Sequence, residues 1–177
     1  MSLPDPGGAS ATGDQPRGSI RDVPLLVVRH ARAGRRSAYR GDDRQRPLTA
    51  RGRAQAEALV ESLAPYRPRR ILSSPYVRCF ETVRPLAVAL GVPVEGVDTL
   101  AEGHGKAVVR LVERMVGEPA VLCTHGDVAD VLLEALAGDR SATVRHELRL
   151  LKGEVWVVQS TGTRLAIVDH LHPRPRR

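Results

Sequence analysis

The stretch LLVVRHA, residues 25–31, joins four aliphatic residues to an arginine-histidine pair. Four consecutive branched aliphatic residues, preceded by Pro24 and followed by a loop rich in glycine and arginine, predict a buried central strand covered on both faces. Ligands of open parallel sheets bind at the carboxyl ends of the strands, where Arg29 and His30 lie. A neutral imidazole can attack phosphorus, and a guanidinium offers paired hydrogen bonds to phosphoryl oxygens. The stretch therefore predicts a strand with a phosphate site at its end.

The composition predicts one domain with a basic surface. The chain has 177 residues, 42% of them hydrophobic, which is enough for one core. The formal net charge is +7, and almost every basic residue is arginine, since only Lys106 and Lys152 are lysines. Aromatic residues make up 3% of the chain, too few for a base-stacking platform, so we expect no nucleic-acid partner. A basic pocket for an anionic small molecule is the alternative to a merely solvated surface charge.

Cysteine usage and hydropathy indicate the compartment. Cys79 and Cys123 form no CxxC pair, and we expect two buried, reduced thiols, as in a cytoplasmic protein. No apolar run approaches the roughly 18 residues that a membrane span needs, so no membrane contact is expected. Residues 1–22 lack the apolar region of a signal peptide and predict a disordered leader. Residues 173–177 predict a basic tail, and we expect the histidines just before it, His170 and His172, to be solvated as well.

Residues 32–47 form a polar stretch with neither a helical nor a strand period. A loop of this length inside a compact domain is usually functional or disordered. We take two of its arginines, Arg36 and Arg40, as candidates for binding the anionic parts of a substrate. Asp42 and Asp43 offer the alternative that the arginines simply pair with them at the surface.

The next elements bring a third cation to the sheet edge. A helix is predicted from its N-cap Thr49, and a strand over residues 69–74 is followed by Ser74 as N-cap and Pro75 as first residue of another helix. Arg78 then lies in the opening turn, where free N–H groups and the positive end of the helix dipole attract anions. An arginine is unfavourable there without an anionic partner, so Arg78 supports an anion site.

A third strand over residues 92–97 leads to a glycine-rich loop that contains Glu102. A partly desolvated carboxyl can hold its proton near neutral pH, which makes Glu102 the candidate general acid; an ordinary exposed loop residue is the alternative. After a helix over residues 106–116, the strand 120–124 delivers His125 and Gly126 to the start of another helix. Two histidines, with Arg29 and Arg78 at the same edge, would surround one tetrahedral anion.

The last third predicts an antiparallel hairpin, with strands over residues 154–160 and 164–169 around a Thr-Gly-Thr turn. His146 lies in a predicted polar linker and receives no role. The elements together predict an α/β fold: a three-layer α/β/α sandwich whose mostly parallel central sheet ends in an antiparallel C-terminal edge hairpin.

Three motifs in this order resemble those of the histidine phosphatase superfamily, which has the phosphoglycerate mutase-like fold. Residues 28–31 are similar to its Arg-His-Gly signature, with Ala31 in place of the glycine. Residues 73–78 with Thr82 resemble its second arginine motif, and residues 124–126 its second histidine motif. Residues 41–52 and 152–156 are most similar to short bacterial phosphohistidine phosphatases and to the C-terminal domain of certain two-domain Nudix hydrolases. The resemblance assigns residues 23–172 to a histidine phosphatase domain.

The resemblance implies a hydrolase that works through a phosphohistidine and needs no metal or other cofactor. His30 would be the nucleophile, and Arg29, Arg78 and His125 would stabilise the transferring phosphoryl group. Glu102 would protonate the leaving oxygen and then activate water. These roles agree with a transition state whose charge is spread over phosphoryl oxygens.

Several alternatives stay open from the sequence. His104 or Asp127 could share the task of the acid. The histidines and carboxylates could also be drawn as metal ligands, but no HExxH, DxD or CxxC spacing supports this and two arginines would repel a cation. A non-catalytic phosphate-binding or protein-interaction module of the same fold is the alternative function. The expected partner is a phosphorylated small molecule, such as a nucleotide, or a phosphoprotein, and the oligomeric state stays open.

Overall fold

Six strands form one mixed sheet in the computed structural model, which describes residues 23–138, 141–162 and 164–175. The expected leader, residues 1–22, lies outside the described residues, as do the last two residues of the expected tail. The strand order is β3-β2-β4-β1-β5-β6. The strands are β1 (Leu25–Arg29), β2 (Arg70–Ser73), β3 (Val94–Gly96), β4 (Ala120–Thr124), β5 (Val155–Thr161) and β6 (Arg164–Leu171).

The sheet has the predicted mixture of directions. Strand β1 runs parallel to β4, and β2 runs parallel to both β4 and β3. Strand β5 pairs antiparallel with β1 and with β6, so the C-terminal hairpin closes one edge of the sheet. This confirms the prediction of a mostly parallel sheet with an antiparallel edge hairpin.

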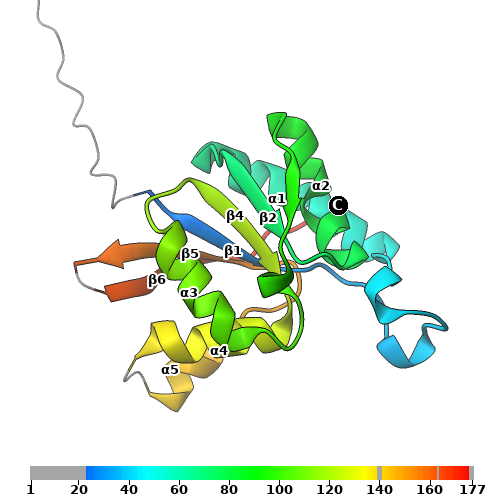
Figure 1. Cartoon of the computed structure of the whole chain (residues 1–177). Helices are drawn as coiled ribbons and strands as arrows, with labels where there is room; N and C mark the ends of the chain where they lie inside the picture. Colours follow the sequence, from blue (N-terminus) through cyan, green and yellow to red (C-terminus); the bar gives the residue numbers. More distant parts are fainter. Residues whose placement is uncertain (1–22, 139–140, 163, 176–177) are drawn as a thin grey trace, which may run out of the picture.

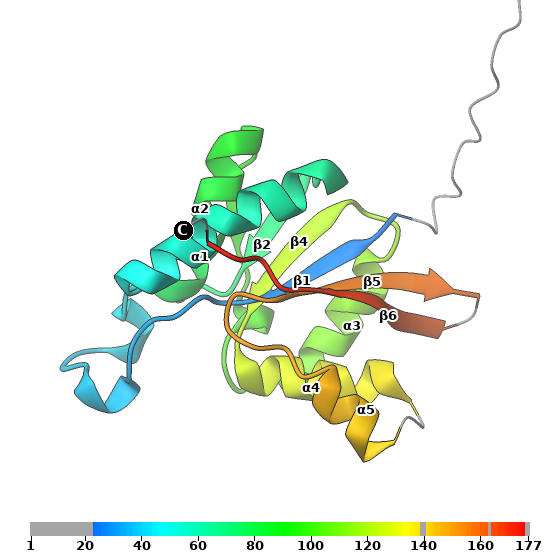
Figure 2. The same cartoon turned by 180° about the vertical axis from the view of Figure 1, so that it is seen from behind.

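Two layers of helices cover the sheet, as Figures 1 and 2 show. Along β1 the side chains alternate: Leu25 and Val27 enter the core under α3 and α4, whereas Leu26 and Val28 enter the core under α1 and α2. Burial on both faces explains why this strand carries four aliphatic residues in a row. The helices are α1 (Ala50–Leu63), α2 (Val77–Leu90), α3 (Gly105–Met115), α4 (Gly126–Ala137) and α5 (Ala142–Glu147).

Three local predictions were wrong. Helix α2 begins after Tyr76 and not after Ser74, because the Ser74 hydroxyl contacts His125 across the sheet instead of capping the helix. His146 is in helix α5, which Ser141 caps by accepting a hydrogen bond from Val144 N, and not in a linker. His170 is in β6, and its side chain is only 11% exposed.

The two cysteines are free and buried, as predicted. None of the described helices has both the length and the apolar character that crossing a membrane requires.

Candidate active site

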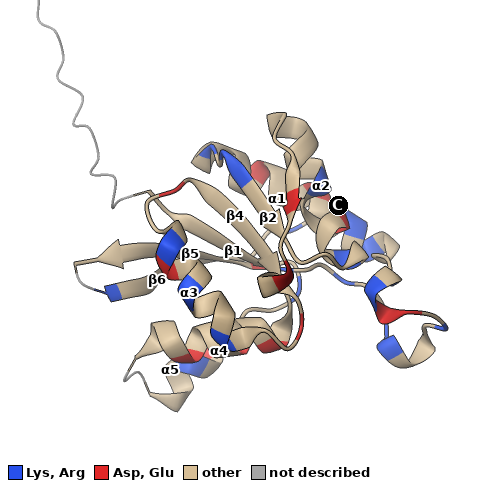
Figure 3. Ribbon diagram, in the orientation of Figure 1, with Lys and Arg blue, Asp and Glu red and all other residues tan. Residues whose placement is uncertain are grey.

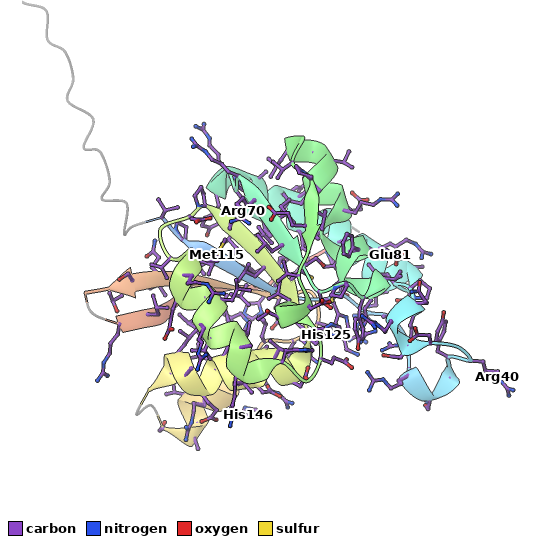
Figure 4. The ribbon with its side chains drawn as sticks, viewed as in Figure 1. Arg40, Arg70, Glu81, Met115, His125 and His146 are labelled. Carbon is purple, nitrogen blue, oxygen red and sulfur yellow. The ribbon has the colours of Figure 1, made fainter. Side chains whose placement is uncertain are left out.

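The parallel pair β1 and β4 delivers two histidines to one edge of the sheet. Arg29 and Thr124 are partners in the register, so His30 and His125 follow at the same level on neighbouring strands. Their rings lie edge to face with centroids 5.3 Å apart, and both side chains are buried. Figure 4 shows His125 where the sheet, α2 and the loop before α1 meet. The structure therefore brings together the two histidines that the sequence singled out.

His30 has one ring nitrogen occupied and one free for chemistry. Its Nδ1 lies 2.7 Å from the carbonyl oxygen of Ala31. A carbonyl only accepts, so Nδ1 carries the proton and Nε2 keeps its lone pair. Burial, helped by the charges of His125, Arg78 and Arg29, lowers the pKa of His30 well below 6.5, although the hydrogen bond to Ala31 opposes the shift. The imidazole is therefore held in the neutral form that can act as a nucleophile.

Arg78 is fully buried in the first turn of α2. Its Nη1 donates to the carbonyl oxygen of Asp43 (2.8 Å) and its Nη2 donates to Oε1 of Glu102 (2.7 Å). The same Nη2 lies 3.3 Å from Nδ1 of His125. The guanidinium thus joins three separate segments of the chain at one point.

Thr82 fixes this helix relative to the strand that carries the nucleophile. Its hydroxyl donates to the carbonyl oxygen of Arg78 (2.6 Å) and accepts from the backbone N–H of Ala31 (2.9 Å). Tyr76 packs below the Arg78 guanidinium, with its ring centroid 4.5 Å from Cζ, and touches the edge of the His125 ring. The aromatic ring limits how far either group can move.

His125 is held from both sides of its ring. Its Nε2 lies 2.7 Å from Oγ of Ser74, and its Nδ1 faces Arg78 and Oε1 of Glu102, which is 3.4 Å away. Cys79 Sγ is 3.5 Å from the same Nε2. The imidazole is therefore held in place between the Ser74 hydroxyl on one side and the Arg78–Glu102 pair on the other.

Arg29 is the second guanidinium at this edge. Its Nη1 donates to the carbonyl oxygen of Leu150 (3.0 Å). Gly126 lies directly against it, since a Cβ at that position would stand 2.5 Å from Nη2. Within the described part of the chain, Nε of Arg29 and Nε of Arg78 are buried and have no hydrogen-bond partner. Two buried donors of positive charge without an acceptor mark a place that suits an anion.

Arg29 and His30 border a pocket of about 380 Å³, here called the His30 pocket, whereas the fully buried Arg78 and His125 are not among its lining residues. A larger cavity, about 790 Å³, lies between α3, α4 and the β5–β6 hairpin, but Glu113, Thr161 and Arg164 are the polar side chains among its lining residues, and it contains no histidine. We therefore assign the chemistry to the smaller one. The His30 pocket is lined by Arg29, His30, Arg36, Arg46, Glu102, Gly126, Asp127 and Lys152.

The predicted acid reaches this pocket. Glu102 is paired with Arg78 and with Nη2 of Arg36, and its side chain is 29% exposed. Asp127, the alternative acid, also lines the pocket, but its Oδ2 accepts from the backbone N–H of Gly103 (2.8 Å) and so holds the Glu102 loop. His104 does not line the pocket, and its exposed ring contacts the carbonyl oxygen of Glu102 (3.1 Å). Glu102 is thus the carboxylate in contact with His125.

Comparisons with known proteins agree with this arrangement. The sequence model of the histidine phosphatase superfamily (branch 1) matches residues 25–108. The 8-oxo-(d)GTP phosphatase of Mycolicibacterium smegmatis is 41% identical over 157 residues, which cover 84% of this chain. The chain belongs to the histidine phosphatase superfamily. It spans about half the length of that curated relative, 48%.

Solved structures of histidine phosphatases share the fold. The Agrobacterium tumefaciens protein assigned as phosphohistidine phosphatase SixA superposes with a TM-score of 0.72 at 24% identity, over 86% of this chain and 99% of its own. A protein histidine phosphatase SixA in complex with tungstate gives 0.66 at 18% identity, over 85% and 97%. The mycobacterial glucosyl-3-phosphoglycerate phosphatase gives 0.66 at 19% identity, over 81% and 96%.

Some residues of the arginine-rich loop line the pocket, and others lie at its exposed outer end. Arg36 lines the pocket, whereas Arg40 is exposed at the outer end of the loop and does not line it (Figure 4). Asp43 sets the division, since its carboxylate pairs with Arg36 (2.8 Å), with Nε of Arg46 (2.7 Å) and with Arg78 (3.1 Å). Figure 3 shows basic and acidic segments side by side along this loop.

Asp43 therefore does more than neutralise surface charge. The hydrogen bond from Arg46, followed by that from Arg36, holds the pKa of Asp43 well below its ordinary value, although burial opposes the shift. The carboxylate joins the loop to the buried Arg78 and turns Arg36 and Arg46 toward the pocket. Asp42 instead caps the short helix Asp43–Gln45, since its Oδ1 accepts from the backbone N–H of Arg44 (2.9 Å).

Two more basic residues line the pocket: Arg46, one of the loop arginines that the sequence offered for binding an anion, and Lys152, to which the sequence gave no role. Arg46 is buried, and its Nη1 donates to the carbonyl oxygens of Ala33 and Gly34 (3.1 and 3.2 Å). Lys152 lies in the loop before β5, where its carbonyl oxygen accepts from Gln55 Nε2 (2.9 Å), and burial followed by nearby arginine charges lowers its pKa. The available signal for Lys152 was the similarity of residues 152–156 to short phosphohistidine phosphatases.

Proposed function

We propose that this member of the histidine phosphatase superfamily is a phosphatase. In its reaction, Nε2 of His30 attacks phosphorus and forms a phosphohistidine. The observation that carries the proposal is the 2.7 Å hydrogen bond between His30 Nδ1 and the Ala31 carbonyl oxygen. It fixes the tautomer in which Nε2 has a free lone pair. A buried imidazole in this form, next to two guanidinium groups, suits attack on an anionic phosphorus centre.

The phosphoryl group would be held by Arg29 and Arg78. Each has a buried Nε without a partner among the described residues, and a buried donor without an acceptor costs roughly 1–3 kcal/mol. Phosphoryl oxygens would accept from these groups and recover that cost through charge-assisted hydrogen bonds. The charge that spreads over the oxygens in the transition state would be stabilised in the same way.

Glu102 would serve the leaving group. As the N–P bond to His30 forms, the P–O bond to the leaving oxygen breaks, and that oxygen takes the proton of the Glu102 carboxyl. In the free protein Glu102 is paired with Arg78 and Arg36. A bound phosphoryl group would compete for Arg78 and loosen this pair, which would free the Glu102 carboxyl to turn toward the leaving oxygen.

Hydrolysis of the phosphohistidine would return each group to its starting state. The oxygen of a water molecule bonds to phosphorus, its proton passes to Glu102, and the electrons of the N–P bond return to Nε2 of His30. Inorganic phosphate then leaves with the oxygen of that water molecule bonded to phosphorus. Glu102 keeps the proton from water and can give it to the next leaving group.

The preferred substrate class is a nucleotide or another compound with more than one anionic group. Arg36, Arg46 and Lys152 add three cations to the pocket beyond the two that would hold the transferred group. A pocket with this many cations favours multiply charged ligands. A relative named as an 8-oxo-(d)GTP phosphatase supports a nucleotide, whereas the neighbours named SixA support a protein phosphohistidine as the alternative.

The test is hydrolysis of a panel of substrates in excess EDTA. The panel contains p-nitrophenyl phosphate, nucleoside mono-, di- and triphosphates, and a phosphohistidine peptide. We expect turnover by the native protein, a loss of at least about 10³-fold in His30→Ala, and native activity in His146→Ala, which removes a histidine remote from the pocket. If His30→Ala turns over substrate as fast as the native protein, the mechanism is overturned. Inertness on the whole panel would favour the non-catalytic phosphate-binding module.

A further inference from the structure

Three metal-ligating side chains meet outside the His30 pocket, at the inner end of the C-terminal hairpin. Nε2 of His170 lies 3.0 Å from Oε2 of Glu154, and Nδ1 of His172 lies 2.9 Å from Oε1 of the same carboxylate. The two imidazole rings have centroids 4.3 Å apart. Among the described residues, this is the one group of histidines, cysteines and carboxylates in which three ligand atoms lie within 4.8 Å of one another.

The register of the hairpin creates the group. In the antiparallel pair of β5 and β6, Trp156 faces His170 and Val155 faces Leu171. Continuing the register by one residue sets His172 opposite Glu154. His170 and His172 are two residues apart on an extended strand, so their side chains leave the strand on the same face. Figure 2 shows the segment that leaves β6, in red, beside the orange segment that enters β5.

We propose that Glu154, His170 and His172 bind a divalent transition-metal ion, with Zn²⁺ as the best fit. Two imidazole nitrogens and one carboxylate oxygen are a donor set that favours zinc over magnesium or calcium. In a tetrahedral zinc site with bonds of about 2.0–2.2 Å, ligand atoms lie roughly 3.4 Å apart. The two nitrogen–oxygen distances, 2.9 and 3.0 Å, are slightly shorter than this separation, and all three ligand atoms lie within 4.8 Å of one another. Small side-chain rotations would therefore bring the three atoms to the separation that zinc requires.

The surroundings prepare these side chains for a metal ion. The backbone N–H of Leu151 donates to Oε2 of Glu154 (2.8 Å) and fixes the carboxylate from outside the cluster. Each ring would bind the ion as a neutral imidazole, through the nitrogen that now faces the carboxylate and with its proton on the other ring nitrogen.

A fourth coordination position is available. The cluster borders a cavity of about 200 Å³ whose wall also includes His146, which Figure 4 places on α5. A water molecule in this cavity would complete the coordination.

Metal binding would connect the end of the chain to the backbone of the candidate catalytic strand. The carbonyl oxygen of Glu154 accepts from Arg29 N (3.2 Å), and Gly153 N donates to the carbonyl oxygen of Arg29 (3.0 Å). A bound ion would therefore clamp β6 to the loop that carries Lys152. It would raise the thermal stability while leaving hydrolysis at His30 independent of metal. The proposal stands on this cluster and does not depend on the proposed phosphatase activity.

The test is calorimetric titration of the untagged full chain, stripped with EDTA and then freed of it, with ZnCl₂. We expect one high-affinity site per chain and a higher unfolding temperature with Zn²⁺. His172→Gln should weaken binding at least about tenfold, whereas His104→Gln, which removes another exposed histidine, should not change it. The His172 side chain is 56% exposed, so this substitution leaves the core intact.

Two further measurements separate this cluster from other sites. Co²⁺ in place of Zn²⁺ should give the intense visible bands of a tetrahedral site in the native protein and in His30→Ala, but not in His172→Gln. The proposal is overturned if Zn²⁺ shows no saturable binding, or if His172→Gln binds as tightly as the native chain. Loss of binding in His30→Ala would equally overturn it, because the ion would then occupy the His30 pocket.

Discussion

Gly126→Ala tests whether the position of Arg29 governs catalysis. Gly126 is the first residue of α4, and its backbone does not need the left-handed conformation. A Cβ there would stand 2.5 Å from Nη2 and 2.7 Å from Cζ of Arg29. Nonbonded contacts of this kind normally lie at about 3.5–4.0 Å, so the guanidinium would have to move by roughly 1 Å.

The expected effect is on rate and not on folding. A displacement of roughly 1 Å in a group that positions the reacting phosphoryl costs about 10²-fold in rate, which corresponds to about 2.7 kcal/mol. The clashing atoms are the far end of a flexible side chain, and alanine is favoured over glycine in a helix by about 0.5–1 kcal/mol. We therefore expect the unfolding temperature of Gly126→Ala to stay at or slightly above that of the native protein.

The assay is kcat/KM on the best substrate of the panel, together with thermal unfolding. Gly96→Ala is the matched control, because its Cβ meets only an ordinary contact, 3.6 Å from the Phe80 ring. The decisive comparison uses Arg29→Ala as background, where Gly126→Ala should cause no further loss. Native activity in Gly126→Ala would refute the reasoning. So would an equal loss in the Arg29→Ala background, since the effect would then not pass through Arg29.

Three further outcomes are expected. Burial lowers the pKa of His30 well below 6.5, so its neutral, nucleophilic form persists as the pH falls through 6.5. We therefore expect kcat/KM to stay level there and to decline only at lower pH. A pH-rate profile whose acid limb is centred at or above 6.5 would contradict this. Ser74→Ala removes the 2.7 Å partner of His125 Nε2 and should lower kcat about tenfold, with partial recovery in Ser74→Thr; an unchanged kcat would remove Ser74 from the account. Arg46→Ala should raise KM for a nucleotide about tenfold, whereas Arg40→Ala should leave it unchanged; equal effects in steady-state kinetics would show that the pocket has been drawn wrongly.

The strand ends could be predicted because their chemistry is local. Aliphatic runs before His30 and His125 indicate buried parallel strands, and adjacent parallel strands deliver whatever follows them to the same edge. Arg78 was found for the same reason, since the start of a helix can be recognised from nearby residues. Glu102 was found with less support, because its place depends on contacts with Arg78 and Arg36 that lie far away in sequence.

The residues that sequence reasoning misplaced are governed by distant partners. Whether Arg40 or Arg46 faces the pocket depends on Asp43, which sets the shape of a loop that has no periodic pattern. Ser74 has the sequence signature of an N-cap, but its hydroxyl contacts His125, 51 residues away. His170 resembled a solvated tail because its partner Glu154 lies across the hairpin, 16 residues away. The residues next to Ser74 or His170 in the sequence do not show that a partner far along the chain will be preferred over a nearby one.

The most direct test of the central claim is to trap the covalent intermediate. The native protein is mixed with the preferred substrate, quenched with alkali within milliseconds and analysed by mass spectrometry of its peptides, since phosphohistidine survives alkali. The account predicts one phosphate on the peptide that contains His30 in the native protein, and none in His30→Ala. Turnover without phosphate on His30 under these conditions, or phosphate on His125 instead, would contradict the account.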